Sequence, residues 1–256
     1  MSGRQAIKTP VPLDIGPTDS LVLMTGAGIS AESGIPTFRD QGGLWHEYDI
    51  SEVATPEGFA RNPSLVWEFY SNRREQALKC EPNAGHHAIS TLLDRQRASG
   101  SNAMLVTQNV DGLHERAATA STEDLVRIHG SLFRTRCSSE RCELEAYVDT
   151  ELYYGEIPRC ALCASMLRPG VVWFGEMLGF QEQRSALEAI QSCDWFITVG
   201  TSGTVYPVAG YVNDARRAGA RTVLVNLDAP DNVYFFDEFY QGRAAQILPI
   251  LFGIRA

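Results

Sequence analysis

Four cysteines in one stretch of the chain have the spacing of a metal site. Cys137 and Cys142 form a C-x4-C pair, and Cys160 and Cys163 form a C-x2-C pair. Two such pairs, separated by residues 143–159, can close a tetrahedron of thiolates around zinc. Four protein ligands leave no position for water, so this zinc would be structural and would stabilise a segment too short to build a core. Free thiols or two disulfides are the alternatives.

A glycine-rich turn near the N-terminus is a candidate phosphate site. Residues 21–24 form a short apolar run, which is followed by Gly26-Ala27-Gly28. Such a turn brings backbone amides and a helix N-terminus close to a pyrophosphate. The next glycine is Gly34, so the G-x-G-x-x-G fingerprint of dinucleotide-binding proteins is not met. By itself, the turn fits an ordinary strand-to-helix connection equally well.

The elements that would position these residues alternate between strands and helices. Further apolar runs cover 103–107, 195–199 and 222–225, and helical patterns cover 63–78, 85–97, 181–191 and 207–218. This alternation predicts an α/β fold, a Rossmann-like doubly wound parallel sheet. Ligands bind such sheets at the carboxyl ends of the strands. The polar residues that follow the runs should therefore converge on one crevice.

The domain organisation follows from where the pattern breaks. We expect a loose N-terminal arm over 1–19 and a Rossmann-like domain over 20–133 and 169–256. The cysteine-bearing residues 134–168 would form a small zinc-binding insertion domain, with helical loop elements near 40–80.

Composition limits the classes of function. The net charge is −9, the pI is about 5.1, and there is no dense Lys/Arg run, so nucleic-acid binding is not expected. The chain has no apolar stretch with the length of a signal peptide or a membrane span. Cysteines clustered with metal-ligand spacing are more typical of a protein in a reducing compartment than of a secreted protein. We expect a cytoplasmic protein without membrane contact, and a monomer.

Several segments together resemble the sirtuin (Sir2) family of NAD-dependent protein deacylases, class III or bacterial CobB type. Residues 26–39 resemble the family's NAD-binding signature, residues 108–114 its second signature, and Ile128-His129-Gly130 the segment with its catalytic histidine. The four cysteines and the segments 172–176, 200–202 and 226–228 follow in the family's order. The resemblance runs from about residue 20 to the C-terminus.

The resemblance implies a reaction in which NAD is consumed as a co-substrate. The acyl-lysine carbonyl oxygen attacks C1′ of the nicotinamide ribose, and nicotinamide leaves. His129 then takes a proton from the ribose hydroxyls, the 2′-oxygen attacks the acyl group, and water releases free lysine and O-acyl-ADP-ribose. A neutral imidazole has the right pKa range for such a base near pH 7.

The resemblance also assigns roles to individual residues. The catalytic residues would be His129, Asn109 and Asp111. Together with these three, the NAD-binding residues would be Gly26, Ala27, Gly28, Ile29, Ser30, Glu32, Thr37, Phe38, Arg39, Trp45, Gln108, Val110, Gly200, Thr201, Ser202, Asn226, Leu227, Asp228 and Ala244. Acylated protein lysines would bind as extended peptides between two segments. The residues expected there are Val172, Trp173, Phe174, Gly175, Glu176, Val205 and Tyr206.

Two side chains indicate which acyl groups are accepted. On a helix, Tyr70 and Arg73 are three positions apart and share one face, where a phenol and a guanidinium can meet one carboxylate. In class III and CobB-type sirtuins, this Tyr-x-x-Arg reads succinyl- and malonyl-lysine, and Ala54 matches the small residue that leaves the pocket wide. We expect desuccinylation and demalonylation beside deacetylation. The alternative is an amphipathic helix with solvated arginines, which is our interpretation of Arg61 and Arg74.

Other functions remain open at this point. Mono-ADP-ribosyl transfer to protein would use the same NAD pocket, and a zinc-bearing NAD sensor would use it without catalysis. A Rossmann dehydrogenase is disfavoured by the spacing of the glycines. The class III pattern also has smaller residues where this chain has Asp40-Gln41, which could reshape the loop over the pocket.

Overall fold

A computed structural model of the protein describes residues 6–37 and 48–254. Its larger part is a parallel sheet of six strands in the order β3-β2-β1-β7-β8-β9. The strands are β1 (Leu21–Thr25), β2 (Ala103–Thr107), β3 (Leu125–Arg127), β7 (Trp195–Val199), β8 (Arg221–Asn226) and β9 (Glu238–Gln241). The predicted doubly wound α/β fold is confirmed. The short edge strands β3 and β9 were not predicted.

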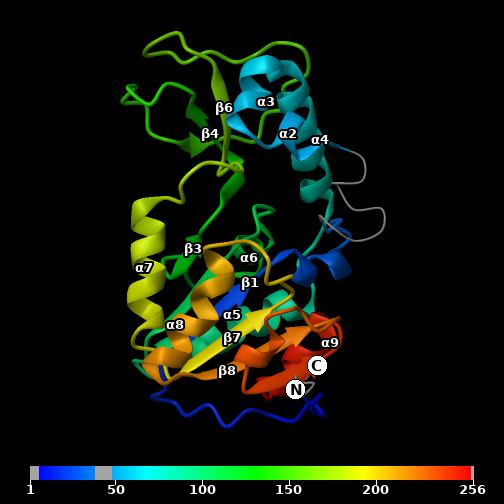
Figure 1. Ribbon diagram of the computed structural model, residues 1–256, viewed down its shortest axis with the longest axis vertical. Helices are drawn as coiled ribbons and strands as arrows, with labels where there is room; N and C mark the ends of the chain where they lie inside the picture. Colours follow the sequence, from blue (N-terminus) through cyan, green and yellow to red (C-terminus); the bar gives the residue numbers. More distant parts are fainter. Residues whose placement is uncertain (1–5, 38–47, 255–256) are drawn as a thin grey trace.

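Helices cover both faces of this sheet. Alternate side chains of a strand point to opposite faces, and in β1 Leu23 packs in one core cluster while Val22 packs in another. The Leu23 face is covered by α5 (Ala84–Ala98) and α9 (Ala244–Leu251). The Val22 face is covered by α7 (Phe180–Ile190) and α8 (Tyr211–Ala218) (Figure 1). Each of the four predicted helical patterns corresponds to a helix. The pattern over 207–218 was predicted to begin at 207, whereas α8 begins at Tyr211.

A second lobe extends beyond the sheet, at the end away from the two termini (Figure 1). Its antiparallel sheet has the order β5-β4-β6. These strands are β4 (Gly130–Cys137), β5 (Tyr147–Val148) and β6 (Leu167–Val171), and the helices packed with them are α2 (Ile50–Val53), α3 (Pro56–Arg61) and α4 (Pro63–Lys79). One core cluster joins α4 to both long strands. The lobe around the cysteines therefore includes helices that lie far before them in the sequence.

Two helices of the second lobe begin at residues whose side chains cap the helix N-terminus. Asn62 is the N-cap of α4, where its side chain accepts a hydrogen bond from the Leu65 amide, and Pro63 takes the first helical position. Thr55 caps α3 in the same way through the Gly58 amide. The Asn62 cap fixes the first residue of α4, the helix that carries Tyr70.

Short elements complete the chain. They are the 3-10 helices η1 (Ala27–Ile29), η2 (Ala31–Ser33), η3 (Val208–Gly210) and η4 (Val233–Phe235), and α6 (Leu113–Ala117). Among the residues of both described ranges, no helix is long and apolar enough to cross a membrane.

The N-terminal arm is attached to the sheet from residue 7 onward, so the expectation of a loose arm is wrong there. Ile7 forms a parallel bridge with Phe239, and the Lys8 amide donates to the Phe239 carbonyl at 2.8 Å. The Lys8 ammonium lies 3.0 Å from the buried Glu238 carboxylate. Farther along, the Leu13 amide donates to the Leu251 carbonyl.

Arg74 is fully buried, so its interpretation as a solvated residue is wrong. Its guanidinium donates to the carbonyls of Leu132 and Glu151, both at 2.6 Å, and to Thr135 Oγ1 at 2.9 Å. It also forms an ion pair with Asp149 at 3.3 Å. A helix residue thus bonds to β4 and to the segment after β5, which joins the helices of the second lobe to its sheet. Arg61 is exposed, as expected.

We predict that Arg74→Met lowers the free energy of unfolding by about 3–5 kcal/mol, because it leaves a carboxylate and carbonyls buried without their donor. Denaturant unfolding of the two proteins would measure the change. Arg61→Met, on the exposed helix α3, is the matched control and should change stability by less than about 0.5 kcal/mol. Equal effects of the two substitutions would contradict the structural role given to Arg74.

Candidate functional site

The polar segments after four strands meet at the carboxyl edge of the large sheet, as predicted. The Gly28 amide, after β1, donates to the Gly200 carbonyl, after β7, at 2.8 Å. Gln108 Nε2, after β2, donates to Thr201 Oγ1 at 3.2 Å. Asn226 Nδ2, at the end of β8, donates to the Thr201 carbonyl at 3.0 Å. Because β1 lies between β2 and β7, this crevice is at the switch point of the sheet.

The glycines of the first turn are required by the contact between two turns. A Cβ on Gly28 would lie 2.8 Å from Gly200 Cα, and a Cβ on Gly26 would lie 2.8 Å from the Gly200 carbonyl oxygen. Gly200 itself has φ +63°, a conformation that side chains disfavour. The two turns can approach so closely only because these side chains are absent.

Most amides of the first turn are engaged within the protein. The amides of Gly26, Gly28, Ile29 and Ser30 donate to backbone carbonyls of this turn, of β7 or of Gly200. Among the described residues, Ala27 is the member of the turn whose amide has no such acceptor. Of the backbone amides predicted to face a phosphate, that of Ala27 is therefore the one not already engaged within the protein. Any further contacts from 26–30 would come from side chains.

A buried polar network forms the floor of the crevice. Ser30 Oγ donates to Asp111 Oδ2 at 2.7 Å, and Asn109 Nδ2 donates to Ser30 Oγ at 3.1 Å. The Leu113 amide donates to the other oxygen of Asp111 at 2.9 Å. Burial raises the pKa of the Asp111 carboxyl, and the two hydrogen bonds oppose this shift. The network holds Asn109 and Asp111 in one orientation.

Two buried histidines lie beneath this floor. The Asn83 amide donates to His86 Nδ1, so His86 Nε2 carries the proton and points to Ser30 Oγ at 3.4 Å. Burial is the main reason that the pKa of His86 is lowered to about 4. His114 Nε2 lies 2.9 Å from Thr25 Oγ1. His86 has a structural role, because it forms a capping box with Asn83 at the start of α5.

His129 is held through one ring nitrogen by a backbone carbonyl. It lies between β3 and β4, and its Nδ1 is 3.2 Å from the Gln108 carbonyl oxygen. A carbonyl can only accept, so Nδ1 carries the proton and Nε2 keeps its lone pair. Burial lowers the pKa of the imidazole below 6.5, although the bond to Gln108 acts in the opposite direction. The ring is therefore neutral near pH 7.

The residues predicted to read the acyl group lie together. Ala54 and Tyr70 are buried, and the guanidinium carbon of Arg73 is 5.9 Å from the Tyr70 ring centre. Trp173 Nε1 donates to the Tyr70 hydroxyl at 3.0 Å. The Phe174 amide donates to the Ala54 carbonyl at 3.0 Å. The segment after β6 thus contacts both α4 and Ala54.

Other predicted residues have structural partners or lie at the surface. Glu32 Oε2 accepts from the Ala245 amide at 2.8 Å and so holds the start of α9, where Ala244 is buried. Val110 is buried, and Thr37 is partly buried. Exposed side chains at the rim belong to Ser202, Leu227, Asp228, Phe174 and Tyr206, with Val205 partly covered and Gly175 exposed. Phe38, Arg39, Asp40, Gln41 and Trp45 lie outside the described residues.

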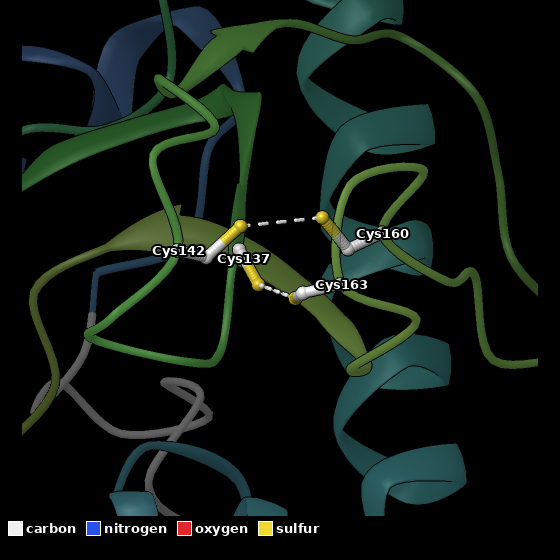
Figure 2. Close-up of side chains that lie close together, drawn as sticks. All are labelled: Cys137, Cys142, Cys160 and Cys163. Atoms are coloured by element: carbon white, nitrogen blue, oxygen red, sulfur yellow. Dashed lines mark hydrogen bonds between the residues drawn. The ribbon is translucent and has the colours of Figure 1, made fainter.

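The four cysteines gather as predicted, with 137 and 142 on one side and 160 and 163 on the other (Figure 2). Sγ of Cys137 and Cys163 are 3.5 Å apart, as are those of Cys142 and Cys160, and all four lie within 4.8 Å of one another. A tetrahedral zinc with Zn–S bonds of about 2.3 Å requires S···S distances of about 3.8 Å. The sulfurs are too far apart for disulfides, whose bonds are about 2.05 Å. The donor set fits zinc.

The cysteine cluster is distant from the crevice. Cys137 ends β4, and His129 immediately precedes this strand. Eight residues of extended chain span roughly 25 Å. A metal held by four thiolates at that distance would be too far from His129 to act there and would stabilise the second lobe.

Comparisons with known proteins identify the family of the chain. The family model described as "Sir2 family" matches residues 26–207. The NAD-dependent protein deacylase of Pasteurella multocida is 45% identical over 90% of this chain and 94% of its own length. The mitochondrial NAD-dependent protein deacylase sirtuin-5 of Canis lupus familiaris is 41% identical over 90% and 79%. The crystal structure of a Sir2 homologue in complex with NAD superposes with a TM-score of 0.80, at 38% identity, covering 90% of this chain and 86% of that one.

We predict that the purified protein contains one zinc ion per chain and that Cys160→Ser abolishes stoichiometric binding, because it removes a buried ligand. Elemental analysis would measure zinc, and hydrogen exchange would locate the loss of structure in the second lobe. Cys193→Ser, outside the cluster, should keep full zinc content. Full zinc in the Cys160 variant would contradict the ligand assignment.

Proposed function

Because this chain belongs to the Sir2 family, we propose that it removes acyl groups from protein lysines with NAD as co-substrate and accepts acidic acyl groups. The observation that carries the proposal is the joint position of a neutral His129 and the Tyr70–Arg73 pair. Backbone hydrogen bonds from one segment reach both His129 and Ala54: the Val172 amide donates to the His129 carbonyl at 2.9 Å, and Phe174 donates to Ala54.

The residues of the crevice fit a dinucleotide. Ala27 and the side chains of Thr201 and Ser202 would hold the phosphates and the adenosine half, and Asn109 and Asp111 would hold the nicotinamide ribose. When bound, NAD supplies the ADP-ribose group that accepts the acyl chain as nicotinamide leaves. Gln108 has a double role in this scheme, because its carbonyl orients His129 while its amide bonds to Thr201.

His129 acts as the general base in this proposal. Its Nε2 lone pair takes the proton of a ribose hydroxyl, which makes that oxygen nucleophilic toward the acyl carbon. The Gln108 carbonyl stabilises the imidazolium through Nδ1–H while the proton is held. Free lysine and O-acyl-ADP-ribose are the products.

The acyl pocket favours a terminal carboxylate for electrostatic reasons. Burial lowers the pKa of the Arg73 guanidinium, while Tyr70 and Asp111 oppose this shift. An anion placed beside this partly buried guanidinium gains a charge-assisted hydrogen bond, and the Arg fork matches both carboxylate oxygens. Ala54 leaves room for a chain longer than acetyl. Succinyl- and malonyl-lysine are therefore the proposed acidic substrates.

Peptide substrates would pass between 172–176 and 204–207. The amides of Val172, Trp173 and Phe174 are already engaged, with acceptors on His129, Glu176 and Ala54. Peptide pairing is therefore left to other atoms of these segments and to exposed residues such as Tyr206, whose exposure is 72%.

We predict that kcat/KM for deacylation falls on the acid side with an apparent pKa below 6.5, because His129 must be unprotonated and burial lowers its pKa. His129→Ala should reduce the rate about 100-fold to 10,000-fold while keeping fold and zinc. Initial rates between pH 5 and 8, with circular dichroism of the variant, test this. Full activity of the variant would refute the assignment.

We predict that Arg73→Met lowers kcat/KM for succinyl-lysine peptides about tenfold to a hundredfold, the value of a hydrogen bond to a charged group. Activity on acetyl-lysine peptides should change little. Mass spectrometry of peptide and O-acyl-ADP-ribose gives both rates, and it also detects any ADP-ribose transferred to protein. Arg61→Met is the control. An equal fall on both peptides would show that Arg73 does not read a carboxylate.

A further inference from the structure

Trp173 connects the acyl pocket to a buried ion pair. Its indole N–H donates to the Tyr70 hydroxyl at 3.0 Å, and its side chain is 3% exposed. The residue was expected to contact the peptide, and its indole also bonds to Tyr70, one of the residues predicted to read the acyl group. The neighbours of Trp173 bond to His129 and Ala54, so the position of the indole is fixed relative to both.

The chemistry of this hydrogen bond determines the direction of the Tyr70 proton. An indole nitrogen can only donate, so the phenol oxygen must be the acceptor. The phenol keeps one proton, which has to point away from Trp173. Among the described residues, the bond from Trp173 is the hydrogen bond that the structure gives to this hydroxyl. The O–H of Tyr70 is therefore available to donate toward the pocket, on the side of α4 that also carries Arg73.

Arg168 and Glu176 hold the indole in place. The guanidinium carbon of Arg168 is 3.3 Å from the ring centre of Trp173, which is a close cation–π stack. The two terminal guanidinium nitrogens of Arg168, Nη1 and Nη2, donate to the Glu176 carboxylate at 2.5 and 3.0 Å. Glu176 also accepts from the Trp173 amide at 2.8 Å. Arg168 thus restrains the face of the indole, and Glu176 restrains the backbone of Trp173.

The stacked guanidinium also strengthens the donor. A cation over the ring draws electron density from the indole, which makes its N–H a better donor to Tyr70. Hydrogen bonds in a chain polarise one another, so a phenol that accepts a strong bond donates a stronger one. A carboxylate that receives this bond gains more than a neutral acyl group, since bonds to ionised acceptors are stronger.

We propose that Trp173 is a positioning residue for acyl specificity: its indole N–H, held by Arg168 and Glu176, directs the Tyr70 hydroxyl toward the terminal carboxylate of succinyl- or malonyl-lysine. This inference rests on the proposed acceptance of acidic acyl groups. It assigns to Trp173 a role in selecting the acyl chain, in addition to packing beside Phe59.

The test compares Trp173→Phe with the parent on succinyl- and acetyl-lysine peptides. Phe keeps an aromatic ring but lacks the N–H. We expect kcat/KM for succinyl-lysine to fall about threefold to tenfold, the value of one hydrogen bond, mainly through KM. Any loss of peptide contacts would lower both rates alike, so the succinyl-to-acetyl ratio is the deciding measurement and should fall about threefold to tenfold. Both rates come from one preparation, so partial unfolding cancels in the ratio.

A double-mutant cycle shows whether Trp173 acts through Tyr70. In a Tyr70→Phe background, Trp173→Phe should leave the succinyl-to-acetyl ratio unchanged, because the hydroxyl it directs is gone. An unchanged ratio for Trp173→Phe in the parent, or the same fall in both backgrounds, would overturn the inference. Arg168→Lys, which keeps the charge and the indole but loses the planar stack, should lower the ratio in the same direction. This variant decides the matter if Trp173→Phe does not fold.

The outcomes also separate this inference from the proposed function. A parent enzyme that removes acetyl but not succinyl or malonyl groups would refute the acidic-acyl proposal and this inference together. A parent that removes all of them, with a ratio insensitive to Trp173, would refute the inference alone.

Discussion

The close approach of two turns at the centre of the large sheet is the constraint on which the site depends. Gly28 and Gly200 belong to turns that leave adjacent parallel strands, and their backbones touch without intervening side chains. This contact brings the segment after β1 beside the segment after β7 and leaves the polar side chains around them facing the crevice. Any side chain at Gly28 or Gly200 would push the two halves of the proposed NAD site apart.

His129, the proposed catalytic base, lies where the two lobes join. His129 follows β3 of the large sheet and precedes β4 of the small one, while its carbonyl accepts from the segment after β6. Its orientation therefore depends on both sheets. The Arg74 side chain on α4 donates to a carbonyl of β4. The helix that carries Tyr70 and Arg73 is therefore fixed relative to the strand that follows His129. The four-cysteine site and the buried arginine both belong to this lobe.

Local patterns predicted much of this structure from the sequence. The central strands are continuous apolar runs, and the cysteine pairs carry their spacing within a few residues, so each could be recognised without knowledge of the fold. The environments of Arg74 and Trp173 could not. Trp173 bonds to a residue 103 positions away, and Arg74 to residues 58 to 77 positions away. Spacing on a helix gives the direction of a side chain but not what lies opposite. The edge strands β3 and β9 are too short to show a distinct apolar pattern.

The N-terminal arm has a consequence for how the chain behaves at high concentration. A parallel sheet ends in strands whose outer amides and carbonyls are unpaired, and such edges invite strands from other molecules. Beyond β9, the bridge from Ile7 and the amide of Lys8 take up part of that edge, and the Lys8 ammonium adds a charge beside it. At the opposite edge, β3 offers only three residues. In the described part of the chain, the large sheet thus leaves little exposed strand on which aggregates could grow.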